Sequence, residues 1–184
     1  GDDVLVCGLP LSPTAALQSL QLAAVGAGSP AFFPGQDADE LAASLRLIPA
    51  TVLAQPTDAA AQLLDDLDEA GAELSTVTTL LLVGAPTDDE RAEAAAALAR
   101  VGVSAAVLAV HVPDGHRLMW GECRRGGTGL HTYPDLELVQ LVDPETGEAS
   151  SDGGPQEIVL TQLGLRGSAL LRWRTGDLAD EVAT

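Results

Sequence analysis

Lysine is missing from this sequence, because the nine basic residues among its 184 are all arginines. Against them stand 27 aspartates and glutamates, which give a formal net charge of −18. A chain this acidic cannot neutralise phosphates over a broad surface, so nucleic-acid binding is disfavoured. Six of the nine arginines fall between Arg117 and Arg174, so the positive potential that exists is concentrated in the last third of the chain.

Aromatic residues are also scarce, at 3% of a chain that is 46% hydrophobic. Such a composition is typical of a globular protein whose core consists mainly of Leu, Val and Ala. No run of eighteen apolar residues occurs, and no basic segment precedes an apolar one at the start. We therefore expect a cytoplasmic protein with neither a membrane span nor a secretion signal. The two cysteines, Cys7 and Cys123, match no metal or redox spacing and are expected to be free thiols.

Short apolar runs alternate five times with helical patterns in the first part of the chain. The runs show no period-two alternation, which is typical of a parallel sheet covered by helices. Strands are expected at residues 4–8, 31–33, 51–54, 80–83 and 105–110. Helix-start patterns lie between them, at Ser12-Pro13, at Asp37 with Glu40, at Thr57 and at Thr87 with Glu90.

The pattern changes after residue 110. Residues 136–142 alternate between apolar and polar, which predicts a half-exposed antiparallel strand, and residues 157–163 and 168–174 predict two more. The sequence therefore predicts an α/β fold: a mostly parallel sheet with flanking helices, followed by a smaller antiparallel β subdomain. We place the two subdomains at residues 1–114 and 115–184.

Five short motifs follow one another in the second half of the chain. They are Glu122-Cys123, Gly129-Leu130-His131, residues 143–148 (DPETGE), residues 157–161 (EIVLT) and residues 172–177 (RWRTGD). In this order and spacing they resemble the phenylacetate–CoA ligase branch of the adenylate-forming, AMP-binding enzymes. Residues 25–27, 51–53 and 82–86 resemble the first half of the same region more diffusely. The resemblance covers nearly the whole chain and corresponds to the central part of the family.

The resemblance implies a nucleotide site for ATP or AMP. Gly84, Ala85 and Pro86 would line the adenine, because a base can stack on bare glycine backbone. Asp177 would hold the two ribose hydroxyls, because a carboxylate can accept a hydrogen bond from each of them. Arg174 would lie near the phosphates or the carboxylate product. Without the family, the first segment is a plain turn after a strand and Arg174 is a surface cation.

The sequence departs from the family at three catalytic positions. The Ser/Thr/Gly-rich loop that cradles the triphosphate has no counterpart, since residues 126–129 are similar but misplaced. A chain without lysine cannot supply the catalytic lysine that stabilises the transferring phosphate. Pro113 stands where the family has the glutamate that helps to hold Mg²⁺. We therefore assign no catalytic residue and no metal ligand, and expect Mg²⁺ only if a larger parent enzyme is active.

These observations lead to an acyl- or aryl-CoA ligase-like domain that keeps the adenine and ribose half of the site and is not catalytic alone. Its small-molecule partners would be a nucleotide or a carboxylic acid, and CoA is a possible further ligand. The alternative is a non-catalytic binding or scaffold module that docks a partner protein or a second copy of itself. An unrelated doubly wound nucleotide-binding domain is a third interpretation.

Three smaller groups of residues could either bind a ligand or be ordinary parts of the fold or surface. His111, His116, Cys123 and His131 could bind zinc, or could be surface histidines with a buried thiol. Arg124-Arg125 could meet the phosphates of a CoA-like ligand, or could be a solvated loop. The acidic residues at 65–69 could bind a cation, although a solvated helix face is the expected state.

Overall fold

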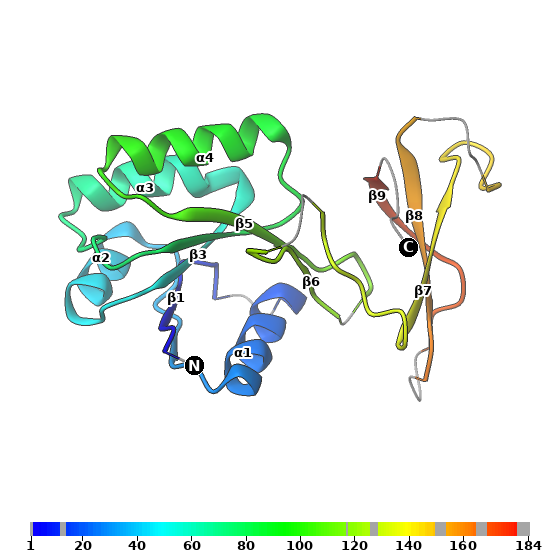
Figure 1. Ribbon diagram of the computed structural model, residues 1–184, viewed down its shortest axis with the longest axis horizontal. Coiled ribbons are helices and arrows are strands. Elements are labelled where there is room, and N and C mark those ends of the chain that lie inside the picture. The colour runs from blue at the N-terminus through cyan, green and yellow to red at the C-terminus, as the bar shows by residue number, and fades with distance from the viewer. Residues whose placement is uncertain are drawn as a thin grey trace. The chain divides into compact units, whose positions relative to one another are not determined.

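A computed structural model describes residues 2–11, 14–116, 118–125, 129–149, 154–164 and 169–179. The chain forms two compact units (Figure 1). The first contains residues 1–112 and 117–130, and the second contains residues 113–116 and 131–184.

The first unit is built on a six-stranded sheet with the order β2-β1-β3-β4-β5-β6. The first five of these strands are parallel, and β6 pairs antiparallel with β5. Leu80 and Leu82 of β4 are fully buried, as the apolar run 80–83 predicts for a central strand. The strand bounds are β1 Leu5–Cys7, β2 Ala31–Phe32, β3 Val52–Pro56, β4 Thr79–Val83, β5 Ala106–His111 and β6 Trp120–Gly121.

Helices cover both faces of this sheet, which confirms the predicted α/β class. Helices α2, α3 and α4 pack on one face and α1 packs on the other (Figure 1). The larger core lies on the α2–α4 side, where Leu41, Leu53 and Leu64 are fully buried. The helix bounds are α1 Ala15–Ala27, α2 Ala38–Leu47, α3 Ala60–Glu69 and α4 Asp88–Arg100. None of the helices in the described ranges has the length and apolarity that a membrane crossing requires.

Two of the expected helix starts are confirmed. The Asp37 side chain accepts the Glu40 N–H at the start of α2, and Thr87 with Glu90 forms a reciprocal capping box at α4. The α1 cap is Thr14, whereas the expected Ser12-Pro13 lies outside the described residues.

Thr57 was expected to cap a helix, and this prediction is wrong. It opens a single 3₁₀ turn, η1 (Thr57–Ala59), and α3 begins only after Ala59, without a side-chain cap. The Thr57 side chain faces Gly84 instead of a helix N-terminus. A Cβ placed on Gly84 would lie 2.7 Å from the Thr57 hydroxyl oxygen, so Thr57 packs directly over Gly84.

The second unit is a three-stranded antiparallel sheet in the order β7-β8-β9. Its strands are β7 Glu137–Val142, β8 Gln156–Gln162 and β9 Trp173–Ala179. The third strand was expected from residue 168, but it begins at Trp173, and residues 165–168 lie outside the described ranges. The division at residue 114 stays a prediction. In the structure, residues 117–130 group with the first unit because β6 pairs with β5.

Candidate functional site

The segment Gly84-Ala85-Pro86 follows β4 at the carboxyl edge of the parallel sheet. Open α/β sheets bind their ligands at this edge. Gly84 has a φ of 143°, which residues with a side chain rarely adopt, and its N–H donates to the Val110 carbonyl at 2.8 Å. The turn is therefore fixed by its backbone, and one side of Gly84 is covered by Thr57.

Two polar side chains at the same edge were not identified as candidate site residues from the sequence. Gln55, near the end of β3, is fully buried, and neither its amide nitrogen nor its oxygen has a hydrogen-bond partner. The hydroxyl of Thr57 is also buried without a partner. The only sequence signal was a glutamine at the end of an otherwise apolar strand, which amino-acid patterns alone do not distinguish from an exposed strand end.

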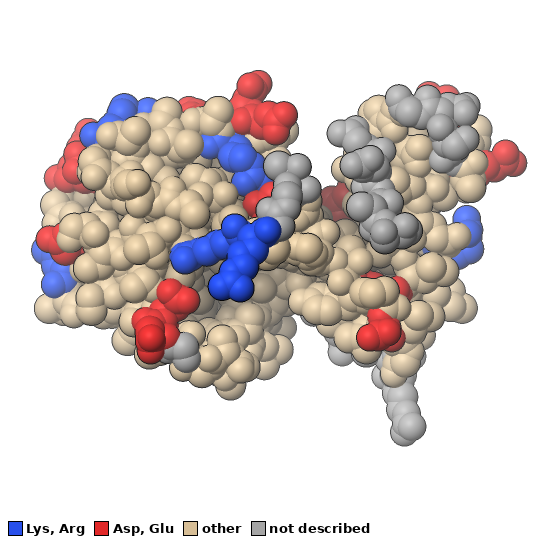
Figure 2. All heavy atoms as spheres, viewed as in Figure 1, with Lys and Arg blue, Asp and Glu red and all other residues tan. Residues whose placement is uncertain are grey.

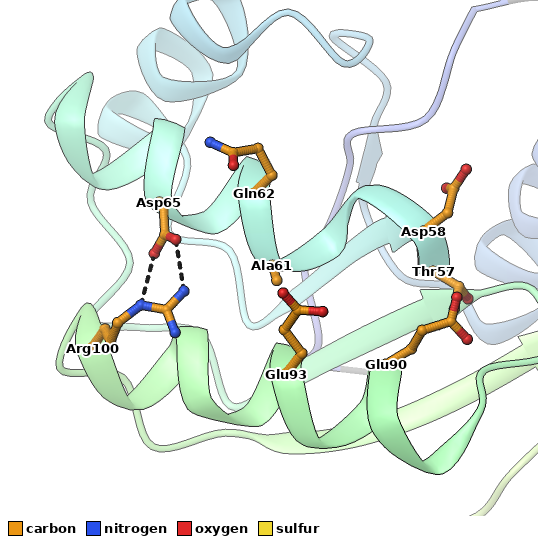
Figure 3. Close-up of a pocket in the computed structure, with 8 residues that line it drawn as sticks. All are labelled: Thr57, Asp58, Ala61, Gln62, Asp65, Glu90, Glu93 and Arg100. Atoms are coloured by element: carbon orange, nitrogen blue, oxygen red, sulfur yellow. Dashed lines mark hydrogen bonds and ion pairs between the residues drawn. The ribbon is translucent and has the colours of Figure 1, made fainter.

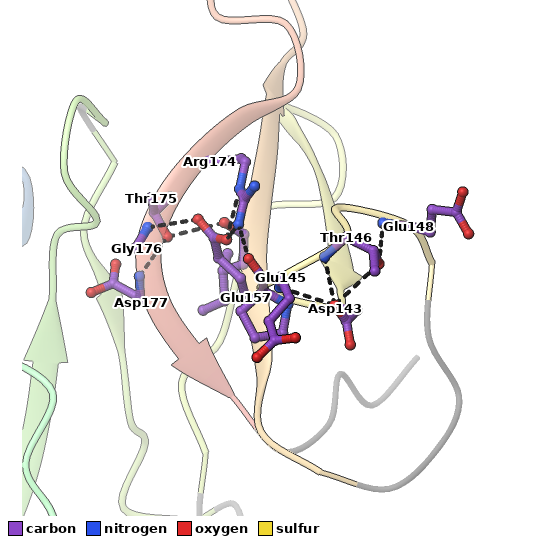
Figure 4. Close-up of polar contacts among 11 residues, drawn as sticks. Asp143, Glu145, Thr146, Glu148, Glu157, Arg174, Thr175, Gly176 and Asp177 are labelled. Atoms are coloured by element: carbon purple, nitrogen blue, oxygen red, sulfur yellow. Dashed lines mark hydrogen bonds and ion pairs between the residues drawn. The ribbon is translucent and has the colours of Figure 1, made fainter.

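Arg174 lies in an ion pair within the second unit (Figure 4). Its Nε donates to Glu157 at 2.7 Å, one terminal nitrogen also meets Glu157, and that nitrogen donates to the Pro144 carbonyl at 2.5 Å. This hydrogen-bonded guanidinium lowers the pKa of Glu157, and the carboxylate raises that of Arg174. Arg174 therefore links β9, β8 and the turn after β7.

Asp177 lies in a hydrogen-bonded turn within β9. The Thr175 hydroxyl donates to the Ile158 carbonyl at 3.0 Å and accepts the Asp177 N–H at 3.1 Å. Gly176 has a φ of 80° and donates its N–H to Glu157 at 3.2 Å. Figure 4 shows the Asp177 carboxylate pointing away from the Arg174–Glu157 pair. The Asp177 backbone is thus held by its hydrogen bond to Thr175, while the half-buried Asp177 side chain points to the side of the turn opposite Glu157.

The DPETGE motif forms a structural turn between β7 and β8. One carboxylate oxygen of Asp143 accepts the backbone N–H groups of Glu145 and Thr146, at 2.9 and 2.7 Å, and the Thr146 hydroxyl at 3.1 Å. The hydrogen bonds from Thr146 are the main cause of a lowered pKa at Asp143. The motif therefore shapes the loop whose Pro144 carbonyl receives Arg174.

In the Glu-Cys motif, the first residue, Glu122, holds two elements of the fold together. Glu122 forms a bidentate pair with Arg91, with the shorter contact at 2.7 Å, and accepts the Ala109 N–H at 2.8 Å. It thereby joins α4 to β5. Cys123 is exposed, so the interpretation of a buried thiol at this position is wrong; the buried free cysteine is Cys7.

The histidines do not form a metal centre. His116 was interpreted as a surface residue or a zinc ligand, but it is buried and its Nε2 lies 2.9 Å from a carboxylate oxygen of Glu137. The other oxygen of Glu137 accepts the Tyr133 N–H at 2.7 Å. Within the described ranges, no three His, Cys, Asp or Glu side chains are grouped closely enough to hold a metal ion.

A shallow groove of about 130 Å³ runs between α3 and α4 (Figure 3). Asp65 in this groove pairs with Arg100 at 2.6 Å, and Asp66 outside it accepts Gln62. The acidic run therefore belongs to a solvated helix surface. The groove is far below the roughly 300–1,000 Å³ of small-molecule sites, so it is not a nucleotide site.

Arg124 and Arg125 are exposed on the first unit, and Arg124 donates to the hydroxyls of Thr78 and Thr79. Figure 2 shows blue side chains gathered on this unit beside acidic ones. Arg124 is thus anchored at the start of β4.

The fold and the order of the motifs define the class. The chain has the fold of the acyl-CoA ligases of the adenylate-forming superfamily, which confirms the resemblance seen in the sequence. No family model matches the sequence. Over 57 residues the chain is 40% identical to a phenylacetate-coenzyme A ligase of Thermus thermophilus, a stretch that covers 31% of this chain and 13% of that ligase.

Two solved structures show how much of such a ligase the chain represents. The open conformation of 2-hydroxyisobutyryl-CoA ligase, in complex with 2-HIB-AMP and CoA, matches 96% of this chain with a TM-score of 0.79 and 17% identity. A long-chain-fatty-acid-CoA ligase of Archaeoglobus fulgidus matches 87% with a TM-score of 0.66 and 13% identity. The chain spans 43% of the first protein and 34% of the second.

Proposed function

We propose that this chain binds the adenosine part of AMP or ATP and does not itself catalyse adenylation. Gly84, Ala85 and Pro86 would contact the base, and Asp177 would accept the ribose hydroxyls. The turn of residues 175–177 carries this proposal, because its hydrogen bonds hold the Asp177 backbone and the carboxylate points away from Arg174 (Figure 4). A carboxylate positioned in this way is suited to two vicinal hydroxyls.

Binding is expected to be weak and independent of the phosphates. Arg174, the cation nearest in sequence, is already bonded to Glu157 and Pro144. The net charge of −18 also disfavours a triphosphate. We expect dissociation constants in the high-micromolar to millimolar range, roughly 4–6 kcal/mol. ATP should bind no better than adenosine.

Thioester chemistry is proposed only for a larger protein that also supplies a phosphate loop, a lysine and a Mg²⁺ site. The 2-hydroxyisobutyryl-CoA ligase was solved with an acyl-adenylate and CoA, but the chain spans 43% of that protein. Carboxylic acid, CoA and Mg²⁺ therefore enter the proposal as ligands of such a parent. We further propose a cytoplasmic location, where the free thiols of Cys7 and Cys123 would remain reduced.

Ligand-observed NMR with adenosine, AMP and ATP tests the proposal. The wild type should give a binding signal with all three, and Asp177→Ala should abolish it, because the ribose hydroxyls lose their acceptor. Asp135→Ala, an exposed acid in the same unit, is the matched control and should bind like the wild type. No adenosine signal in the wild type would refute the proposal, as would an unchanged signal in Asp177→Ala.

The docking alternative is favoured by one observation, the outer face of α1. Residues 4–36 contain no charged side chain, although the chain is 20% charged, and α1 leaves Leu22 72% and Val25 79% exposed. Apolar surface of this kind marks interaction sites when it is contiguous. Sedimentation velocity would detect self-association of the chain. The double substitution Leu22→Glu with Val25→Glu should abolish this self-association. A monomer at every concentration would exclude a second copy as the partner.

A further inference from the structure

Gln55 is the one buried residue among the described positions whose amide nitrogen and amide oxygen both lack a partner. A carboxamide can donate two hydrogen bonds and accept two. Leaving these unmade in the interior destabilises the folded state, and buried polar groups in native proteins are satisfied in the great majority of cases. The position therefore carries a cost that a leucine or methionine would avoid.

The location of Gln55 indicates what offsets this cost. The chain leaves β1 for β2 on one side and then runs through β3, β4 and β5 on the other, so the strand order reverses between β1 and β3. In open α/β sheets, ligands bind at the carboxyl ends of the strands at such a reversal. Gln55 is the fourth residue of the five-residue strand β3, at that carboxyl end. Beside it Gly8, which follows β1, donates its N–H to the Ala54 carbonyl at 2.8 Å.

The polar groups here share one face of the sheet. Gln55 lies two residues after Leu53 in the strand, so both side chains point to the same face. Leu53 belongs to the core on the α2–α4 side of the sheet. Thr57 follows two residues later and its unpartnered hydroxyl lies against Gly84. None of these residues is charged. Together they offer donors and acceptors to an uncharged ligand group that itself both donates and accepts.

We propose that Gln55 reads the amino edge of the adenine base in the nucleoside site. This inference rests on the proposed function. The carboxamide of glutamine pairs in a bidentate way with the amino group and an adjacent ring nitrogen of adenine. Gln55 is fully buried, so this contact requires η1 to move outward. That turn is a single 3₁₀ turn whose N-cap, Pro56, supplies no side-chain hydrogen bond.

The first test needs no ligand. Gln55→Met keeps the length of the side chain and removes the unpartnered amide, so its melting temperature should rise by roughly 2–10 °C. Gln162→Met is the matched control, because Gln162 is buried and its amide oxygen accepts the Leu170 N–H at 3.3 Å; it should melt lower than the wild type. Gln55→Leu gives a second variant with the same expected sign. A lower melting temperature in both Gln55 variants would show that the amide serves the fold and would overturn the inference.

The second test compares adenosine with purine riboside, which lacks the 6-amino group, by ligand-observed NMR titration. The wild type should prefer adenosine by about tenfold, and Gln55→Met should bind the two equally. A wild type without preference, or a variant that keeps it, overturns the role of Gln55 and leaves the nucleoside site standing. A wild type that binds neither nucleoside refutes the proposed function as well. Gln162→Met should retain the wild-type preference.

Discussion

The tight contact between Thr57 and Gly84 gives the most quantitative prediction, through the substitution Gly84→Ala. The new Cβ would lie 2.7 Å from the Thr57 hydroxyl oxygen and 3.2 Å from its Cβ. The φ of 143° adds backbone strain of about 1–3 kcal/mol, and overpacking adds about 1–3 kcal/mol. We expect the free energy of unfolding of the first unit to fall by roughly 2–6 kcal/mol.

Circular dichroism at 222 nm during urea unfolding is the assay, because every helix in the described ranges lies in the first unit. Thr57→Ala in the Gly84→Ala background should recover the part of the steric loss that comes from the hydroxyl, and leave the Cβ contact and the backbone part. Gly26→Ala in α1 is the control with the opposite sign: nothing lies within 4 Å of its added Cβ, so it should stabilise by about 0.5–1 kcal/mol. A loss below about 0.5 kcal/mol for Gly84→Ala would refute this reasoning, since that is the range of ordinary surface substitutions.

Three further predictions follow from the described contacts. At pH 8, a thiol reagent should modify exposed Cys123 rapidly and Cys7 only on unfolding, because burial raises the pKa of Cys7 to about 11; two equally fast thiols would contradict this. Asp143 should titrate below its ordinary value of 3.8 in a ¹³C NMR titration, and Thr146→Ala should raise its pKa. Since the folded pKa is the lower one, this carboxylate stabilises the fold fully above the ordinary value and loses that effect as pH falls through the folded pKa; an unshifted titration would count against the turn. Arg174→Ala should leave the ratio of ATP to adenosine affinity unchanged, because its guanidinium is already hydrogen-bonded to Glu157 and Pro144; a selective loss of ATP affinity would contradict that.

The layer architecture was readable in the sequence because parallel strands buried on both faces require continuous apolar runs. The run 80–83 became the central strand β4. Residues 136–142 became β7, but its burial does not alternate as predicted, because Glu137 is buried and Leu138 is exposed. Helix starts were readable where the cap and its partner are three residues apart, as at Thr87 and Glu90. These signals are local, so no knowledge of the folded chain was needed.

The polar contacts were not readable because their partners are distant in the chain. His116 looks like a surface residue until β7 brings Glu137 to it, 21 residues later. Thr57 is of a residue type that often caps helices, yet in the folded chain it packs against Gly84 in the turn after β4. The role of Arg174 near a ligand stays a prediction from the family resemblance, and its bond to Glu157 was missed because it depends on the pairing of β8 with β9. Each of these depends on tertiary structure that local sequence does not encode.

The central claim is that Asp177 holds the vicinal hydroxyls of a nucleoside. Its most direct test is a ligand-observed NMR titration of the wild-type chain with adenosine and with 2′,3′-dideoxyadenosine, which carries the same base without those hydroxyls. Our account predicts binding of adenosine in the high-micromolar to millimolar range and binding of the dideoxy compound at least tenfold weaker, since at least one charge-assisted hydrogen bond is lost. Equal binding of the two nucleosides would contradict the account.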